Sequence, residues 1–315
     1  MPSKILPSVY RIEGEYAGEY GYLSSYLYIA DDECLVIDPR TAGSPGKKIL
    51  KAIKTLGLKA SRDVIGILCT HAHPDHVGGV KMLKEETGAP VIIHADAVPL
   101  LREPGLFTKS RLRLNLSERI AMKFERGPLR VNYDGQEADR ILNDRDLVHI
   151  GNSTLRTILT AGHSAGHCAF YDSDRKILFC GDEITNFPNS PRKFYVDLSG
   201  SMIAKRCALE KIKKMEIDYL LPAHDIPHLF GDVRTQIVES LSGVIAFQDS
   251  VLEHVCIRGE ADIEQLVFDI TKANSIPYPK EMKALLPTTI LVALRSLQKA
   301  GLVFEEEGIW MSENC

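Results

Sequence analysis

Four side chains of metal-binding type lie within six consecutive residues of this chain. They are His71, His73, Asp75 and His76. Imidazole nitrogens and carboxylate oxygens are the groups that bind zinc, iron and nickel in proteins. The apolar run Val64–Cys69 before them is typical of a buried strand, and Pro74 stiffens the loop that follows. Because a loop at a strand end can turn alternate side chains to one point, the first two imidazoles can converge on one ion, and the carboxylate and third imidazole on a second.

The elements that would position this loop alternate between strands and helices. Short apolar runs with polar turns between them predict strands at Tyr22–Ile29, Cys34–Ile37, Val64–Cys69, Val91–His94, Leu155–Leu159, Ala169–Tyr171, Ile177–Cys180 and Tyr219–Leu221. Apolar residues at helical spacing predict helices at Lys47–Leu56, Gly78–Glu86 and Met202–Met215. This alternation predicts a mixed α/β fold.

The chain from about Ser240 onward has a different pattern. Three helix-like segments are followed by a short hairpin, an order that looks like a winged helix. The helix-like segments are Val244–Val255, Asp262–Thr271 and Thr288–Lys299, and the hairpin strands are Leu302–Phe304 and Ile309–Met311. Six basic and eleven acidic residues give this tail a net charge of −5. Since a DNA-reading winged helix is basic on its recognition face, we expect this tail to pack against a partner, a second copy or its own catalytic domain.

A basic stretch lies between the two halves of the strand pattern. From Arg102 to Arg130 there are eight lysines and arginines against three acids, a local charge of +5. We expect a solvated helix face there. The alternative is a cationic lid that meets an anionic substrate.

Composition limits the class of protein. The 315 residues allow about two domains, and 25% charged with 44% hydrophobic residues is ordinary for a globular chain. The net charge of −4 gives no overall signature of a nucleic-acid binder. We see no secretory signal and no apolar run approaching about 18 residues. Seven cysteines without a C-x-x-C pair argue against a disulfide framework. These features predict a cytoplasmic protein without membrane contact.

The residues from His71 to His76 match the motif H-x-H-x-D-H in full, and here the sequence resembles the metallo-β-lactamase superfamily of hydrolases. The resemblance covers roughly residues 8–235. It extends to later strand-end positions, which are His163, Asp182 and His224. It implies a four-layer αββα sandwich in a catalytic domain of residues 1–239, followed by a small, mostly helical winged-helix-like domain of residues 240–315. It also implies that Asp38, after an apolar run, supports the metal loop.

The resemblance further implies a dinuclear centre of two divalent metal ions, with zinc expected first and iron or manganese as alternatives. The implied ligands are His71, His73 and His163 for one ion, Asp75, His76 and His224 for the other, and Asp182 as the bridge. Two dications about 3.5–4 Å apart turn a bridging water into hydroxide, which attacks a carbonyl carbon or a phosphorus. Asp182 and Asp75 are therefore candidate catalytic residues, the latter by orienting the nucleophile or passing a proton.

A few positions near the motif need their own interpretation. Tyr195 is a third catalytic candidate, because some lactone-cleaving relatives present a tyrosine after the bridging aspartate; simple packing is the alternative. Ala223 stands where the family commonly has glycine, so the backbone there must accept a Cβ. His167 and His94 are expected to be structural.

The function that we favour is hydrolysis of an ester, thioester or lactone of a small molecule, as in glyoxalase II or the acyl-homoserine lactonases. The alternative is a metal-dependent endoribonuclease or phosphodiesterase, which the tail and the basic stretch support and the acidity of the tail weakens. A mononuclear iron persulfide dioxygenase is less favoured because it uses fewer metal ligands. A non-catalytic scaffold with a relic site is also less favoured, because no metal ligand is missing. The partner is therefore expected to be a small-molecule substrate rather than nucleic acid, and a homo-oligomer is left open.

Overall fold

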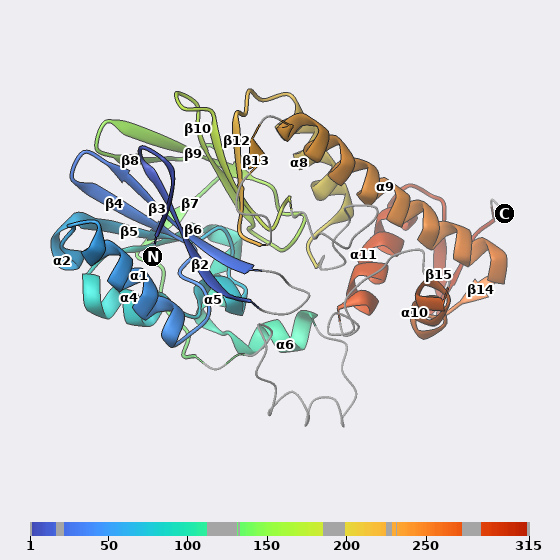
Figure 1. Cartoon of the computed structure of the whole chain (residues 1–315). Helices are drawn as coiled ribbons and strands as arrows, with labels where there is room; N and C mark the ends of the chain where they lie inside the picture. Colours follow the sequence, from blue (N-terminus) through green and yellow to red (C-terminus); the bar gives the residue numbers. More distant parts are fainter. Residues whose placement is uncertain are drawn as a thin grey trace.

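The computed structural model describes residues 2–16, 22–111, 131, 133–184, 199–224, 229–230, 232–272 and 285–313. In these residues two β-sheets face each other, helices cover both outer faces, and a mostly helical part follows at the C-terminal end (Figure 1). The mixed α/β sandwich with helices on both outer faces is confirmed.

The first sheet contains, among the described residues, seven strands in chain order. They are β1 (Ser3–Leu6), β2 (Val9–Tyr16), β3 (Tyr22–Ala30), β4 (Glu33–Ile37), β5 (Val64–Leu68), β6 (Val91–His94) and β7 (Arg140–Leu142). The first four strands pair antiparallel, and β4 to β7 pair in parallel. Because parallel strands end at the same edge, the residues after β5 and β6 lie at one edge of this sheet.

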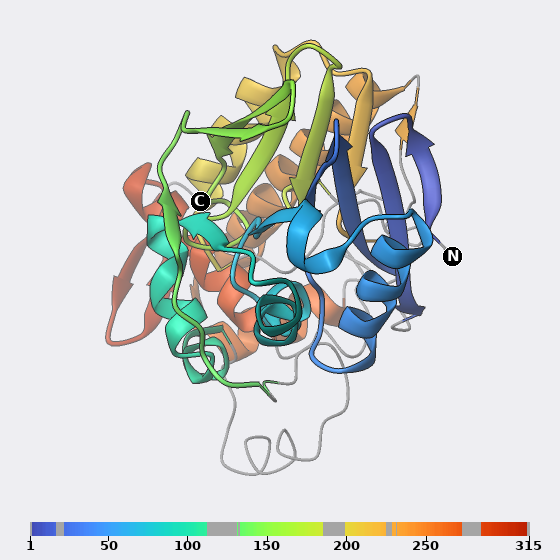
Figure 2. The ribbon, with the colours of Figure 1, turned by 90° about the vertical axis from the view of Figure 1, so that its left-hand side faces the viewer.

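Helices cover the outer face of the first sheet (Figure 2). The longer ones are α1 (Ser44–Thr55), α4 (Val80–Thr87) and α5 (Val98–Arg102); short turns of helix are α2 (Ala60–Asp63), α3 (Pro74–Val77) and η2 (Ala95–Ala97). Ile49, Ile53 and Leu83 are fully buried in a core with β-strand residues such as Val36. Buried side chains three and four residues apart are the pattern that predicted a helix near Lys47–Leu56.

The second sheet has, in the described chain, the order β13-β12-β11-β10-β9-β8. Its strands are β8 (Leu147–Ile150), β9 (Ser153–Leu159), β10 (Cys168–Asp172), β11 (Ile177–Gly181), β12 (Tyr219–Pro222) and β13 (Leu229–Phe230). Its inner face meets the first sheet through an edge-to-face contact of Tyr26 with Phe179, at 5.5 Å between ring centroids. Its outer face is covered by α8 (Met202–Lys213) and α9 (Val233–Arg258).

The C-terminal part continues from α9 without a break. It contains β14 (Glu260–Ala261), α10 (Ile263–Lys272), α11 (Leu286–Lys299), β15 (Phe304–Glu306) and β16 (Ile309–Met311). The predicted helices and hairpin are confirmed, and β14 joins the hairpin. The predicted boundary at residues 239/240 falls inside α9, because Ile237, Leu241 and Val244 continue one buried helical face across it. The winged-helix assignment stays a prediction.

The cysteine pattern is only partly as expected. Cys34, Cys69, Cys168 and Cys180 are buried free thiols, whereas Cys207 is exposed. Cys256 is disulfide-bonded, which the scattered spacing did not predict. Across the described ranges we find no helix with the length and apolarity needed to cross a bilayer.

Candidate metal centre

The predicted ligands come from loops that follow strands of both sheets. The first loop follows β5 and runs into α3, while His163 follows β9, Asp182 follows β11 and His224 follows β12. Backbone contacts join the sheets at this edge: Cys168 N donates to Thr70 O at 2.8 Å, Ser24 N donates to Ala223 O at 2.7 Å, and Leu23 pairs with His224 in an isolated bridge. Residues far apart in sequence therefore meet at one end of the sandwich.

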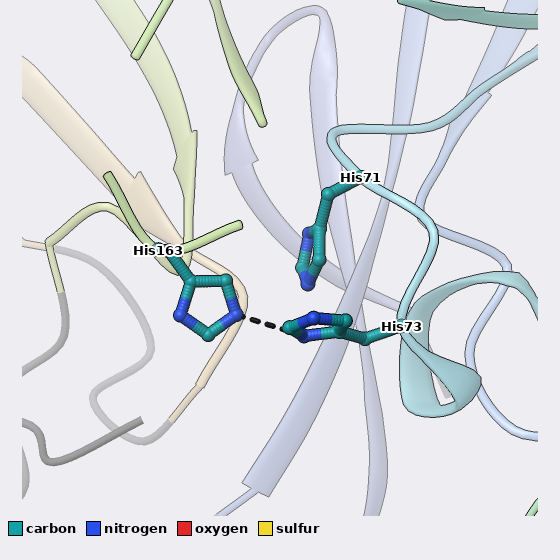
Figure 3. Close-up of side chains that lie close together, drawn as sticks. All are labelled: His71, His73 and His163. Carbon is teal, nitrogen blue, oxygen red and sulfur yellow. Dashed lines mark hydrogen bonds between the residues drawn. The ribbon is translucent and has the colours of Figure 1, made fainter. Parts of the chain in front are cut away.

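One half of the cluster consists of three histidines. Figure 3 shows the rings of His71, His73 and His163 turned toward one another, with His163 Nε2 at 2.9 Å from His73 Nδ1. One ring nitrogen from each lies within 4.8 Å of the other two. Burial lowers the pKa of all three imidazoles well below the usual value, so they are neutral at pH 7 and have lone pairs available.

The other half combines a carboxylate with two histidines. His224 Nε2 lies 3.3 Å from Asp75 Oδ2 and 3.3 Å from His76 Nε2. Burial alone would lower the pKa of both imidazoles, but the nearby carboxylates, led by Asp182, outweigh it; they raise the pKa of His76 well above 6.5 and that of His224 to about 10. This half is therefore built to hold positive charge.

Asp182 lies between the two halves. Its Oδ2 is 3.4 Å from His163 Nε2 and 3.2 Å from His224 Nε2, and its Oδ1 is 3.3 Å from His76 Nε2. His71 Nε2 lies 4.0 Å from the same Oδ2. A single carboxylate thus reaches both groups of ligands.

Asp38 orients ligands of both halves from behind. Its Oδ1 accepts from Thr70 N and its Oδ2 from Thr70 Oγ1, each at 2.8 Å. Since the Thr70 hydroxyl donates to Asp38, it accepts from His71 Nδ1 at 3.0 Å, which leaves the lone pair of His71 on Nε2. Asp38 Oδ2 is also 3.0 Å from His76 Nδ1. The supporting role expected for Asp38 is confirmed in this geometry.

Close backbone packing fixes the turn that carries the last two ligands of the motif. A Cβ on Gly79 would lie 2.4 Å from Pro39 O, and one on Gly78 would lie 2.5 Å from Ala42 N. Only glycine permits this approach of α3 to the segment after β4.

His167 supports the site without pointing a free nitrogen into it. Its Nε2 accepts from Asp182 N at 3.0 Å, and its Nδ1 donates to Thr160 Oγ1 at 2.6 Å. Burial lowers its pKa to about 3. Lys205 reinforces the same turn, because its Nζ donates to the carbonyl oxygen of Glu183. The predicted structural role of His167 is confirmed, and His94 likewise accepts from Asp96 N at 3.2 Å.

Helix α6 (Gly105–Arg111) closes one side of the centre. The ring of Phe107 lies 5.1 Å from that of His73, and Arg111, one turn further along, is 2% exposed. Thr288 Oγ1 of α11 donates to the carbonyl oxygen of Arg111 at 2.7 Å, so the C-terminal part holds the end of this helix (Figure 1). The expectation of a solvated face is wrong for Arg111, whose side chain is 2% exposed where its helix meets Thr288, 177 positions away.

The structure brings all seven predicted ligands together. Ala223 has no positive φ, so its Cβ is accepted without strain. Tyr195 lies outside the described residues, as does most of the basic stretch. The sequence did not single out Phe107, whose only signal was its place in a short apolar run.

The donor set fits divalent metal ions. Burying several unprotonated imidazole nitrogens edge to edge is unfavourable unless a cation takes their lone pairs, and His71 Nε2 has no hydrogen-bond partner in the described structure. The three compact groups of ligand atoms are His71 with His73 and His163, His71 with His76 and Asp182, and Asp75 with His76 and His224. Imidazole and carboxylate together are suited to zinc, iron or manganese.

The comparisons with known proteins agree with this fold. The model of the Metallo-beta-lactamase superfamily matches residues 20–224. A crystal structure of a metallo-beta-lactamase family protein from Thermus thermophilus superposes with a TM-score of 0.75 over 98% of this chain and 100% of that one, at 19% identity. At this identity the likeness shows the fold, including the C-terminal part.

Several curated relatives carry names of hydrolases. A probable metallo-hydrolase, YqgX, from Bacillus subtilis is 30% identical over 159 residues, 50% of this chain and 64% of that one. A hydroxyacylglutathione hydrolase from Rhodospirillum rubrum is 30% identical over 164 residues, 51% of this chain and 48% of that one. The acyl-coenzyme A thioesterase MBLAC2 of Gallus gallus is 27% identical over 209 residues, 64% of this chain and 70% of that one. The chain thus spans about half to two thirds of the length of the first two relatives.

Proposed function

The chain belongs to the metallo-beta-lactamase superfamily, and we propose that it is a dinuclear metal-dependent hydrolase that cleaves a thioester of a small molecule. The observation that carries the proposal is the position of Asp182, whose one carboxylate lies within 3.4 Å of histidines from both halves of the cluster. The names of two relatives, a hydroxyacylglutathione hydrolase and an acyl-coenzyme A thioesterase, support a thioester as the substrate class.

In this proposal His71, His73 and His163 would hold one ion, Asp75, His76 and His224 would hold the other, and Asp182 would be shared. When bound, the ions supply an activated water and polarise the acyl oxygen. Asp75 is the most exposed of these side chains, at 13%, whereas the others are at most 3% exposed. Its carboxylate is therefore placed to meet water from the open side and to take or pass a proton. Phe107, which lies against His73, and the buried Arg111 shield the three-histidine half from bulk water.

The test is turnover of thioesters by the metal-loaded chain, followed as release of free thiol. We expect about two metal ions per chain, loss of turnover on chelation and recovery when zinc, manganese or iron is added. Esters, lactones, phosphodiesters and RNA are assayed in parallel. Turnover of RNA or phosphodiesters alone would contradict the proposal.

The nuclease alternative retains one structural argument, the helix, strand, helix, helix and hairpin order of the C-terminal part. A nuclease would use Arg111, Arg113, Arg119 and Lys123 on phosphates, and four such contacts predict a log–log salt slope of about −3 on a single strand. Of these four, the described residues include Arg111, which is buried and whose charge lowers the pKa of His73. We therefore expect weak RNA binding with a shallow slope.

A further inference from the structure

Two buried arginines lie next to the second half of the metal centre. Arg11 on β2 and Arg40, just after β4, are each 1% exposed. Arg11 Nε donates to Ser24 Oγ at 2.7 Å, and Ser24 N donates to the carbonyl oxygen of Ala223, the residue before His224. Arg40 N donates to the carbonyl oxygen of His76 at 3.0 Å. Both arginines are thus tied to segments that carry ligands of the same half.

Their guanidinium groups have too few partners. None of the three side-chain nitrogens of Arg40 has a hydrogen-bond partner in the described structure, and Nη2 of Arg11 also lacks one. Burying N–H groups of a cation without acceptors is costly. Burial and the neighbouring charge of Arg11 lower the pKa of Arg40 to about 9.

One carboxylate balances part of this charge. Glu13 Oε1 lies 3.2 Å from Arg11 Nη1, and the Glu13 side chain is 52% exposed. Among the described side chains, the two guanidiniums and the Glu13 carboxylate leave a net charge of +1, which a monoanion would neutralise and a dianion would exceed. The exposure of Glu13 also shows that the edge of the cluster reaches solvent.

We propose that Arg11 and Arg40 form a binding site for a carboxylate beside the metal centre. The planar fork of a guanidinium matches the two oxygens of a carboxylate, and the four free nitrogens are donors that such a ligand would satisfy. As the carboxylate source we name either the substrate or a free carboxylate in solution, and the two arms of the experiment separate them. The substrate arm rests on the proposed thioester hydrolysis, whereas the free-ligand arm does not.

The first arm measures the thermal unfolding of the metal-loaded full chain in sodium acetate and in sodium chloride of equal ionic strength. Acetate should raise the Tm of the wild type, and Arg40→Met should abolish that rise. In chloride, Arg40→Met should be as stable as the wild type or more stable, because it removes a buried charge without partners. Metal content is measured in both proteins to establish that it is equal. Any acetate bound directly to metal then shifts the Tm of both proteins equally. Arg145→Met, at a side chain 83% exposed, is the matched control and should respond like the wild type.

Three results would overturn the proposal. The first is an acetate effect on the Tm that survives in Arg40→Met, and the second is the lack of an acetate effect on the wild type. The third is unfolding or marked loss of stability of Arg40→Met in chloride, because that would mean that other groups of the protein already satisfy Arg40. A stronger response to phosphate than to acetate would overturn the choice of a carboxylate. Arg40→Lys keeps the charge and loses the fork, so acetate should bind it about tenfold more weakly.

The second arm compares two thioesters of one thiol, with a succinyl and a butyryl group, which differ in a terminal carboxylate. If the substrate supplies the carboxylate, KM for the succinyl thioester should rise about tenfold in Arg40→Met while KM for the butyryl thioester stays unchanged. If KM changes equally for both thioesters in Arg40→Met and the same variant no longer binds acetate, the site would be assigned to a free carboxylate. If the wild type cleaves no thioester, the proposed function fails and the acetate arm still decides on this site.

Discussion

Asp38 Oδ2 lies 3.0 Å from Nδ1 of His76, and both side chains are almost completely buried. This contact fixes which ring nitrogen of His76 faces the carboxylate behind it and therefore turns Nε2 toward Asp182. Through Thr70 the same carboxylate also orients His71. One residue after the fourth strand thus aligns ligands in both halves of the centre.

Replacing Asp38 with Asn should weaken metal binding by about 10–100-fold, because partners behind the ligands set their orientation and basicity. The backbone of Asp38 has φ 53°, a region that Asn accepts readily, so the fold should be retained. Zinc affinity is measured by competition with a chromogenic chelator. Asp134→Asn, at a side chain 79% exposed, is the control. Unchanged affinity in Asp38→Asn would show that Thr70 and the backbone suffice to orient the histidines.

Asp182→Ala removes the carboxylate that reaches both halves. We expect occupancy of at least one metal ion to fall and turnover to drop by orders of magnitude, with the fold retained because the core strands remain. Metal content by mass spectrometry, turnover and circular dichroism are measured together. Asp218→Ala, an exposed position before β12, should match the wild type. Two fully occupied ions with normal turnover would rule out the shared role.

The predictable part of the site lies close together in sequence or follows recognisable buried strands. His71 to His76 lie in the loop after β5 and the short helix α3 that follows it, and the apolar runs before Asp182 and His224 placed both residues at strand ends. The parts that could not be predicted depend on contacts across the fold. The sequence predicts Arg111 as one of eight solvated cations, but its side chain is buried, and Thr288, 177 positions away, bonds to its carbonyl oxygen.

Other differences have the same origin. The boundary predicted at residues 239/240 falls inside α9, whose buried face begins at Val233, and the division into two domains stays a prediction. Nothing in the local sequence around Arg11 or Arg40 indicates that both are buried, since Arg11 bonds to Ser24 on β3 and Arg40 to the carbonyl oxygen of His76 after β5.

The metal-free protein should be most stable near pH 6.5. The pKa values of His71, His73 and His163 lie well below the unfolded value, so the unfolded state binds more protons below about pH 6.5 and stability falls as the pH falls. The pKa of His76 is raised and that of His224 is about 10, so the folded state binds more protons above pH 6.5, and stability falls as the pH rises toward 10.

Each group contributes a slope of about 1.4 kcal/mol per pH unit within its window. Urea unfolding between pH 5 and 9, with and without a chelator, measures the loss of stability on both the acidic and the basic side of pH 6.5. His149→Gln, at an exposed histidine, should leave the curve unchanged. A metal-free protein whose stability rises steadily from pH 5 to 9 would contradict the assignment of raised pKa values to His76 and His224.

Thr288→Val tests whether the C-terminal part shapes the substrate site. The hydroxyl of Thr288 donates to the carbonyl oxygen of Arg111, and the same short helix lays Phe107 against His73. Valine keeps the volume and removes the hydrogen bond, which is worth about 1 kcal/mol. We therefore expect KM for a thioester to rise about fivefold, amide exchange in residues 105–111 to accelerate, and metal content to stay unchanged. Thr55→Val removes a hydroxyl bond to Lys51 O on α1 and should alter none of these. Unchanged KM and unchanged exchange in Thr288→Val would mean that α6 is held over the histidines by Phe107 and its own packing alone.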